Sequence, residues 1–355
     1  MPQSTVNSEQ FKLLSSQTLS DYVTAVAWST QGDVLAATSA AGEVVFWQNG
    51  DLLTLQSGNG ESVDCLAFSH DGKFVAVGGQ NGQVKIWRET ELITTLENAP
   101  TWVDKLAWSP KYNHLAFVLG RKVQVWDADT RDFVAILDFE NSSPLAIDWR
   151  NDGNYIAIAG HLGVKVWNTH NWDEQPYILD IPSTSIAMAW SGDGKYLASG
   201  NIDKTIAVVE TQQLISEDEP SPWIMQGFPG KIRDIAWSQI NSENGAPLLA
   251  CCSVDGIVLW EKQSGEDSDW EATILTNHAD IIQAIDFAAD SFLLASAGSD
   301  GWLCLWENSQ VSQVITGVRD GFTCVAWHPQ ESKIAAGGQN GELLIWGNRI
   351  GGNRE

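Results

Sequence analysis

Two identical glycine-rich segments are the stretches of this chain most suggestive of ligand chemistry. Residues 78–82 and 337–341 both read GGQNG, and such a loop could hold a phosphate on its backbone N–H groups. Each segment is followed, however, by a short apolar stretch that ends in tryptophan, so no helix N-terminus is expected there to bind an anion. The Asn-Gly pair of each segment instead predicts a two-residue β-turn at positive φ. Gln80 and Gln339 would then lie at the rim of the fold.

The other reactive side chains form no catalytic pattern. Five cysteines, an odd number without CxxC spacing, lie in apolar surroundings, which predicts reduced core thiols in a cytoplasmic protein. The chain contains no nucleophile elbow, P-loop, HExxH motif or carboxylate dyad. We therefore expect no enzyme, no bound metal and no cofactor.

The charge balance argues against two classes of partner. Asp and Glu number 45 against 20 Lys and Arg, which gives a formal net charge of −25. Such a surface repels phosphate backbones and anionic lipid, so we expect no nucleic-acid binding and no membrane insertion. The acidic surface indicates either solubility alone or attraction to a basic protein or peptide partner.

Tryptophan marks an internal repeat that must position all of these groups. The chain has 18 tryptophans, and most of them fall into two periodic series. The first series closes short apolar segments at intervals of 39–51 residues and consists of Trp47, Trp87, Trp126, Trp167, Val209 in place of tryptophan, Trp260, Trp306 and Trp346. The second series ends alternating apolar and polar segments and consists of Trp28, Phe68, Trp108, Trp149, Trp190, Trp237, Phe287 and Trp327. Both series indicate eight copies of one unit.

Each copy has the pattern of four short antiparallel strands. Segments of period-2 alternation are broken every 8–12 residues by Gly, Asn and Asp, which is typical of an all-β array. The last copy ends after its third strand, whereas residues 10–14 form an extra strand before the first copy. A ring closed by this N-terminal strand would leave no unprotected sheet edge between the two ends.

These features resemble the WD40-repeat family of β-propellers, whose blades are four-stranded sheets with tryptophan ending the third strand. The resemblance implies one closed propeller of eight four-stranded blades, with seven as the alternative count. We expect a flexible segment at residues 1–9, the propeller at 10–347 and a flexible tail at 348–355. The literal Trp-Asp signature occurs once, at Trp126-Asp127.

The seventh copy alone has the residues for the internal hydrogen-bond chain of the family. The resemblance implies that this chain would link Trp306, Ser296, His278 and Asp300. A catalytic or metal-binding His278 is the alternative, but no second His or acid lies near it at a ligand spacing.

The family layout separates two faces of the ring. Fourth-to-first and second-to-third connections lie on the top face, and the other connections lie on the bottom face. Exposed tryptophan is favoured at binding hot spots, although packing against a neighbouring loop is the alternative. The candidate partner-binding residues of the top face are Tyr22, Trp102, Asp104, Lys231, Arg233, Gln283, Trp302 and Phe322.

Three acidic insertions are expected on the bottom face around the fifth and sixth copies. They could be solvated loops, an acidic docking site with aromatic anchors, or a loose divalent-cation site, for which the EF-hand spacing is missing. The candidate residues are Trp172, Glu217, Asp218, Glu219, Asp267, Asp269 and Trp270.

We interpret the chain as a non-enzymatic scaffold, monomeric by itself, that holds protein or peptide partners and takes part in complex assembly. The alternative is a small-ligand-binding or catalytic propeller that uses the central channel. That function would need polar side chains converging from several blades, whereas the second strands are small and apolar.

Overall fold

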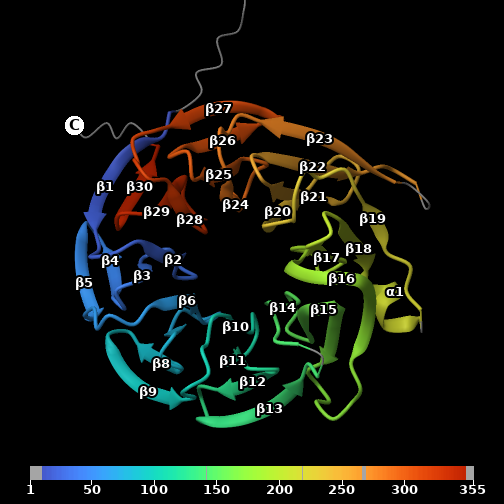
Figure 1. Cartoon of the computed structure of the whole chain (residues 1–355), viewed down its shortest axis with the longest axis horizontal. Helices are drawn as coiled ribbons and strands as arrows, with labels where there is room; N and C mark the ends of the chain where they lie inside the picture. Colours follow the sequence, from blue (N-terminus) through green and yellow to red (C-terminus); the bar gives the residue numbers. More distant parts are fainter. Residues whose placement is uncertain (1–9, 141, 218, 266–268, 349–355) are drawn as a thin grey trace, which may run out of the picture.

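A computed structural model describes residues 10–348 of the chain, except residues 141, 218 and 266–268. These residues form 30 strands and one short helix, α1 (Thr211–Ser216), arranged as a closed ring (Figure 1). The tails expected to be flexible, 1–9 and 348–355, lie outside the described residues apart from Asn348. The all-β propeller architecture is confirmed.

Six of the sheets are four-stranded and antiparallel; five follow the chain, and the sixth combines the last three strands with the N-terminal strand. Three of them contain β2 (Val23–Trp28), β3 (Leu35–Ser39), β4 (Val44–Gln48) and β5 (Asp51–Gln56); β6 (Val63–Phe68), β7 (Phe74–Gly79), β8 (Gln83–Arg88) and β9 (Glu91–Glu97); and β10 (Leu106–Trp108), β11 (His114–Leu119), β12 (Lys122–Asp127) and β13 (Asp132–Asp138).

The other three four-stranded sheets complete the second half of the ring. They contain β20 (Asp234–Asn241), β21 (Pro247–Ser253), β22 (Gly256–Lys262) and β23 (Trp270–Thr276); β24 (Ile282–Phe287), β25 (Leu294–Gly298), β26 (Leu303–Glu307) and β27 (Gln310–Ile315); and β28 (Phe322–Trp327), β29 (Lys333–Gly338), β30 (Glu342–Gly347) and β1 (Lys12–Thr18).

The seventh sheet has six strands, and it overturns the predicted number of blades. It contains β14 (Ala146–Trp149), β15 (Tyr155–Asn168), β16 (Tyr177–Trp190), β17 (Tyr196–Asn201), β18 (Ile206–Glu210) and β19 (Trp223–Met225). The described chain therefore has seven sheets, and the prediction of eight separate four-stranded blades is wrong.

The fourth and fifth sequence copies share this sheet because β16 runs through both of them. Its first half pairs with β15 from Tyr177, and its second half pairs with β17 as far as Trp190. The linking residues 181–184 read IPST and contain no glycine. The residue before a proline favours extended backbone, so the strand continues where other copies turn.

The ring closes through its N-terminal strand, as the sequence predicts. β1 pairs antiparallel with β30, from Lys12 opposite Gly347 to Thr18 opposite Glu342. Phe11, just before β1, also forms two hydrogen bonds with the Gln313 side chain in β27, of 2.8 and 2.9 Å. The N-terminal segment thus joins two neighbouring sheets.

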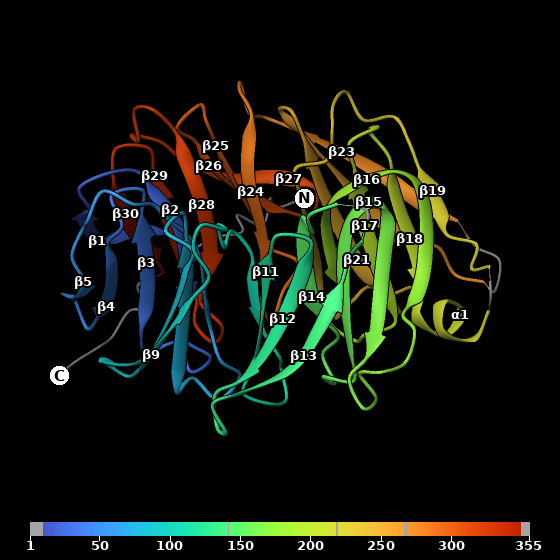
Figure 2. The ribbon, with the colours of Figure 1, turned by 60° about the horizontal axis from the view of Figure 1, so that its bottom comes forward.

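The core lies between the faces of neighbouring sheets. The second strands are small and almost wholly buried, as in β7 and β25, which allows the sheets to approach one another near the axis. The first strands line the centre of the ring and the fourth strands its circumference (Figure 1), and the sheets stand side by side around it (Figure 2). The helix α1 packs at the outside against β16 and β18.

The tryptophans of the first strands connect neighbouring sheets. Each of five donates its indole N–H to a carbonyl of the preceding copy's first strand, at 3.0–3.3 Å: Trp28 to Ala326, Trp108 to Ala67, Trp149 to Ala107, Trp237 to Ala189 and Trp327 to Asp286. The series that marks the repeat in the sequence therefore has a structural cause.

The two GGQNG segments form turns, but longer ones than predicted. Each loop has three residues between the second and third strands, and only its last residue has positive φ: +73° for Gly82 and +84° for Gly341. A hydrogen bond of 3.2 Å from Gly82 N to Gly79 O closes the first of these turns. A turn followed by one left-handed residue is the common three-residue hairpin, so asparagine needs no positive φ here.

Candidate functional site

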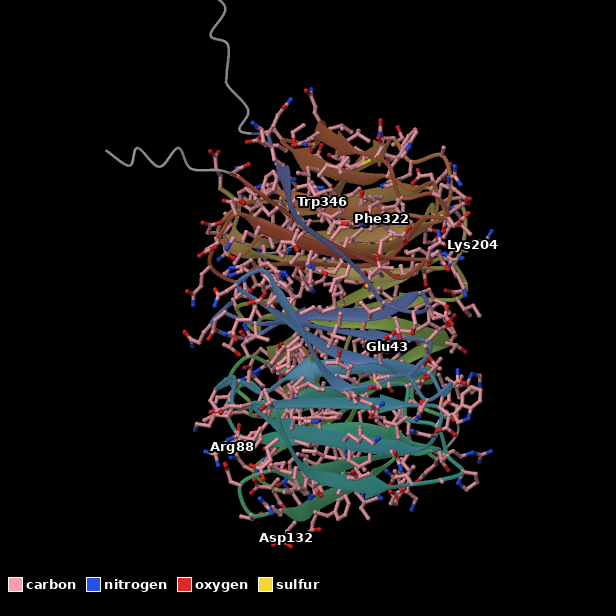
Figure 3. All side chains as sticks on the ribbon, turned by 90° about the vertical axis from the view of Figure 1, so that its left-hand side faces the viewer. Glu43, Arg88, Asp132, Lys204, Phe322 and Trp346 are labelled. Carbon is pink, nitrogen blue, oxygen red and sulfur yellow. The ribbon has the colours of Figure 1, made fainter. Side chains whose placement is uncertain are left out.

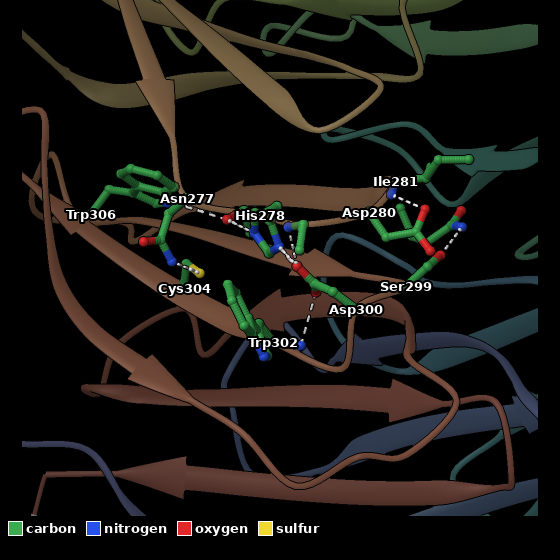
Figure 4. A network of polar contacts seen from close by, with 12 residues as sticks. Asn277, His278, Asp280, Ile281, Ser299, Asp300, Trp302, Cys304 and Trp306 are labelled. Carbon is green, nitrogen blue, oxygen red and sulfur yellow. Dashed lines mark hydrogen bonds and ion pairs between the residues drawn. The ribbon is translucent and has the colours of Figure 1, made fainter.

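The hydrogen-bond chain expected in the seventh copy is present (Figure 4). The Trp306 indole donates to Ser296 Oγ at 2.8 Å, and His278 Nε2 lies 2.7 Å from the same hydroxyl. His278 Nδ1 lies 3.0 Å from Asp300 Oδ2. The side chains of His278 and Asp300 are 0% and 5% exposed.

The partners fix the roles of each atom in this chain. An ionised carboxylate accepts hydrogen bonds only, so Nδ1 of His278 carries the proton and Nε2 accepts from the Ser296 hydroxyl. Asp300 also accepts from the backbone N–H groups of Ala279, at 2.8 Å, and Trp302, at 3.0 Å. The polar side-chain atoms of this hydrogen-bond chain all find their partners within the seventh copy, which favours a structural role.

The top-face candidates differ widely in exposure. Trp102 is 60% exposed and Tyr22 is 38% exposed. Lys231 is also exposed, whereas the half-buried members of the set are Asp104, Arg233, Gln283 and Trp302. Gln283 donates to Ser299 Oγ at 2.7 Å, and Trp302 packs on the core shared by the sheets that contain β22 and β26.

Phe322 is wrongly placed by the sequence analysis. It is 1% exposed, and its ring centroid lies 6.1 Å from that of Trp346. Its position at the start of β28 follows the repeat, in which the residue that begins the first strand points between two sheets. Phe322 therefore belongs to the core.

The bottom-face candidates are also divided. Glu217, Glu219 and Asp269 are exposed, Trp172 is half-buried with its ring 6.3 Å from that of Trp149, and Trp270 is 8% exposed. Asp218 and Asp267 lie outside the described residues.

Trp270 is not an exposed anchor, because the sixth copy uses its insertion to lengthen strands. Trp270 begins β23 and pairs with Lys262 at the end of β22. Its ring lies 5.5 Å from Tyr196, 5.9 Å from Trp237 and 6.3 Å from Trp223. The expected acidic docking loop thus contributes its tryptophan to an aromatic cluster inside the fold.

Three aspartates that the sequence analysis did not single out join neighbouring first strands. Asp148 accepts from Trp190 N at 2.8 Å, and Asp286 accepts from Trp327 N at 2.8 Å. Asp234 accepts from Ile285 N at 3.0 Å. The segments "AIDW" and "AIDF" could have revealed Asp148 and Asp286, because the other copies of the repeat carry alanine in place of these aspartates.

Two family models match parts of the chain. The model described as WD domain, G-beta repeat matches residues 177–209, 271–307 and 309–347, and the model described as anaphase-promoting complex subunit 4 WD40 domain matches residues 26–111. These matches coincide with the repeat units and with the propeller. The chain is a WD40-repeat β-propeller.

Similar proteins cover only part of this WD40 propeller. "Protein SEC13 homolog" from Homo sapiens is 26% identical over 119 residues, which are 32% of this chain and 34% of that protein. "Protein CIA1" from Arabidopsis thaliana is 28% identical over 111 residues, 30% of this chain and 28% of that protein. The matched region thus spans about a third of each relative's length or less.

A solved structure matches almost the whole WD40 propeller. The crystal structure of the computationally designed Ika8 protein has a TM-score of 0.76 and 20% sequence identity, and the match covers 95% of this chain and 100% of that one. At this level of identity the likeness shows the fold alone.

Metal ligands and thiols are two groups that the described part of the WD40 propeller allows to be assessed. No three or more His, Cys, Asp and Glu side chains there are grouped to hold a metal ion. Burial raises the pKa of Cys304 and Cys324 to about 11, so these thiols stay protonated and weakly nucleophilic at neutral pH. No described helix has the length and apolar character of a membrane span.

The three inner aspartates titrate near neutral pH in this WD40 propeller. Burial raises the pKa of Asp148 and Asp286 to about 7 and that of Asp234 to about 6, against the opposing effect of the backbone N–H groups that each accepts. Below these values the folded chain holds protons that the unfolded chain does not hold until near pH 3.8.

We expect Asp286→Asn to change the pH dependence of stability. Because folded Asp286 binds its proton near pH 7 and unfolded Asp286 only near pH 3.8, its contribution to stability grows as the pH falls through that window. As the pH is lowered from about 8 to 5, the free energy of unfolding of the variant should therefore fall relative to that of wild type. The difference should change by at most about 1.4 kcal/mol per pH unit. Urea unfolding across this range tests it, with Asp290→Asn on an exposed loop as the control. Parallel pH profiles for Asp286→Asn and wild type would contradict it.

Proposed function

We propose that this WD40 propeller is a non-enzymatic scaffold that binds a protein or peptide partner on its top face, with Trp102 as the central contact. The observation that carries the proposal is the 60% exposure of Trp102 in a loop between β9 and β10. Tryptophan is one of the residues most enriched at binding hot spots, and here its indole is exposed on a rigid fold.

The backbone around Trp102 is held in place from both sides. Asn98 N donates to Gly82 O at 2.9 Å, and Val103 N donates to Gly79 O at 3.1 Å. Val103, next to Trp102, is fully buried. A fixed loop loses little entropy when a partner binds, so more of the contact energy contributes to affinity.

The surroundings of Trp102 support a protein or peptide rather than a polyanion. Tyr22 occupies the equivalent position of the first copy and is also exposed. The net charge of −25 favours a basic partner. The family model named for a subunit of the anaphase-promoting complex supports a place in a multiprotein assembly, and five free cysteines support a reducing compartment such as the cytoplasm.

Affinity purification of the tagged chain from its own cells tests this proposal. We expect Trp102→Ala to reduce the recovered amount of a stoichiometric partner at least tenfold, because loss of a hot-spot tryptophan costs about 2 kcal/mol or more of binding free energy. The substitution should not lower the melting temperature of the chain. Tyr112→Ala is a matched control, since Tyr112 is 41% exposed in the same copy but in the bottom-face connection between β10 and β11. A partner retained by Trp102→Ala, or lost equally with Tyr112→Ala, would contradict the proposal.

A further inference from the structure

The junctions between neighbouring sheets contain a recurring aromatic stack. Trp108 stacks on Phe74 of the preceding copy with ring centroids 6.0 Å apart and planes 16° apart. Trp237 stacks in the same way on Tyr196, at 6.0 Å and 19°. In both cases an aromatic residue at the start of a second strand receives the tryptophan that ends the next copy's first strand.

The junction between the first and second copies lacks both members of this stack, as does the junction between the sixth and seventh copies, where Leu248 and Phe287 hold the two positions. Val34, just before β3, stands where Phe74 and Tyr196 stand, and Phe68 stands in place of tryptophan. The Phe68 ring instead lies tilted against Phe46, with centroids 5.8 Å apart. Phe68 is half-buried, whereas the aromatics at the same position of the other seven copies are at most 9% exposed.

A cavity of about 490 Å³ lies at this junction. Apolar side chains of Val34, Phe46, Phe68, Phe74 and Val75 contribute to its lining. The cavity lies on the bottom face, because residues of the first-to-second and third-to-fourth connections of both copies surround it. Its volume is within the range of small-ligand pockets, and Val34 and Phe68 are among the residues that line it.

The rim of the cavity is acidic. It carries Asp33, Asp71 and Glu89 against Lys73, and the Arg88 guanidinium lies 6.0 Å from the ring centroid of the lining residue Phe74. Burial alone would raise the pKa of Asp71, but hydrogen bonds from Lys73, Ser69 and Asn113 lower it below its usual value. Lys73 Nζ lies 2.7 Å from Asp71, so the excess charge at the rim is negative. This charge disfavours nucleotides and other anions and favours cations beside an apolar group.

We propose that this cavity binds one aromatic side chain of a partner peptide whose neighbouring residues are lysine or arginine. The partner's ring would complete the stack that Val34 and Phe68 leave incomplete, and its cations would face Asp33, Asp71 and Glu89. An aromatic side chain buries about 150–250 Å² of surface, which is more than an aliphatic side chain would bury in the same cavity. Figure 3 shows Arg88, at the end of β8 beside Glu89, on the face opposite to Lys204 of the top face.

Fluorescence anisotropy with two labelled peptides tests this inference on the full chain. One peptide has the sequence GKKWKKG, and the other replaces its tryptophan with alanine. We expect the tryptophan peptide to bind at least tenfold more tightly. Equal binding of the two peptides, or no tryptophan-dependent binding up to about 1 mM, would overturn the proposal.

A variant that fills the cavity provides the second arm of the test. Val34→Phe with Phe68→Trp restores residues that other copies carry, so we expect it to fold with an unchanged or higher melting temperature and to bind the tryptophan peptide at least tenfold less tightly. Phe287→Trp, at the other phenylalanine position of the series, is the matched control and should leave binding unchanged. Full affinity in the filled variant would overturn the proposal. Trp102→Ala leaves this site intact, so this site and the proposed function can fail independently.

Discussion

A chain that lacks residues 1–18 is expected to lose its single cooperative unfolding transition. The deletion removes β1 and exposes the whole edge of β30, whose residues from Glu342 to Gly347 pair with it. It also removes Phe11, whose ring lies 5.4 Å from Trp327. We expect a loss of about 5 kcal/mol or more, which is comparable with the whole stability of many domains, and association of the exposed edges. Circular dichroism melting and size-exclusion chromatography measure both effects.

The matched control for this deletion removes residues 1–9 only, and leaves Phe11 and β1 in place. We expect its melting temperature and elution volume to equal those of the full chain. If the longer deletion also melts like the full chain, the pairing of β1 with β30 does not close the ring in solution.

His278→Ala is expected to lower the free energy of unfolding by about 2–4 kcal/mol. The substitution leaves the Asp300 carboxylate, whose side chain is 5% exposed, without its imidazole partner, and leaves the Ser296 hydroxyl without its acceptor. Unpaired buried polar and charged groups carry their full desolvation penalty. Differential scanning fluorimetry should show a decrease in melting temperature of about 3–6 °C, as expected for a chain of this length.

His170→Ala is the control for this substitution, because His170 is exposed in the connection between β15 and β16. We expect it to melt within about 1 °C of wild type, as surface substitutions generally do. A His278→Ala chain as stable as the control would show that the buried hydrogen-bond chain does not stabilise its sheet. Retained partner binding by the folded fraction of His278→Ala is also expected, since the side chain of His278 is buried and has no exposed surface for a partner to contact.

Local patterns predicted the strands well because each repeat contains its own signals. The tryptophan that ends a third strand is buried in most copies, as Trp87 and Trp126 are, and Trp47 of the first copy is half-buried. Val209, assigned to the same position without an aromatic ring, is fully buried in β18. Turn residues and period-2 alternation act over a few residues, so a single sequence can show them.

The candidate binding residues were less predictable, because burial depends on neighbouring copies. Phe322 and Trp270 have the composition of exposed anchors but pack inside the fold, against Trp346 and against Tyr196. The cavity beside Phe68 is lined by residues of two different copies, among them Val34 and Phe68, that meet only when the sheets stand side by side. No pattern within one copy shows such a coincidence.

The sequence by itself determined the all-β class, the strand segments and the closing N-terminal strand, since each follows from residues within one repeat or from the count of repeats. The hydrogen-bond chain around His278 followed from the family resemblance. Tertiary structure decided how those segments are divided among sheets. β16 joins two copies into one six-stranded sheet, because hydrogen bonding continues wherever the backbone stays extended. Tertiary structure also decided which aromatic side chains remain exposed, since the space between two sheets is filled by residues far apart in the chain.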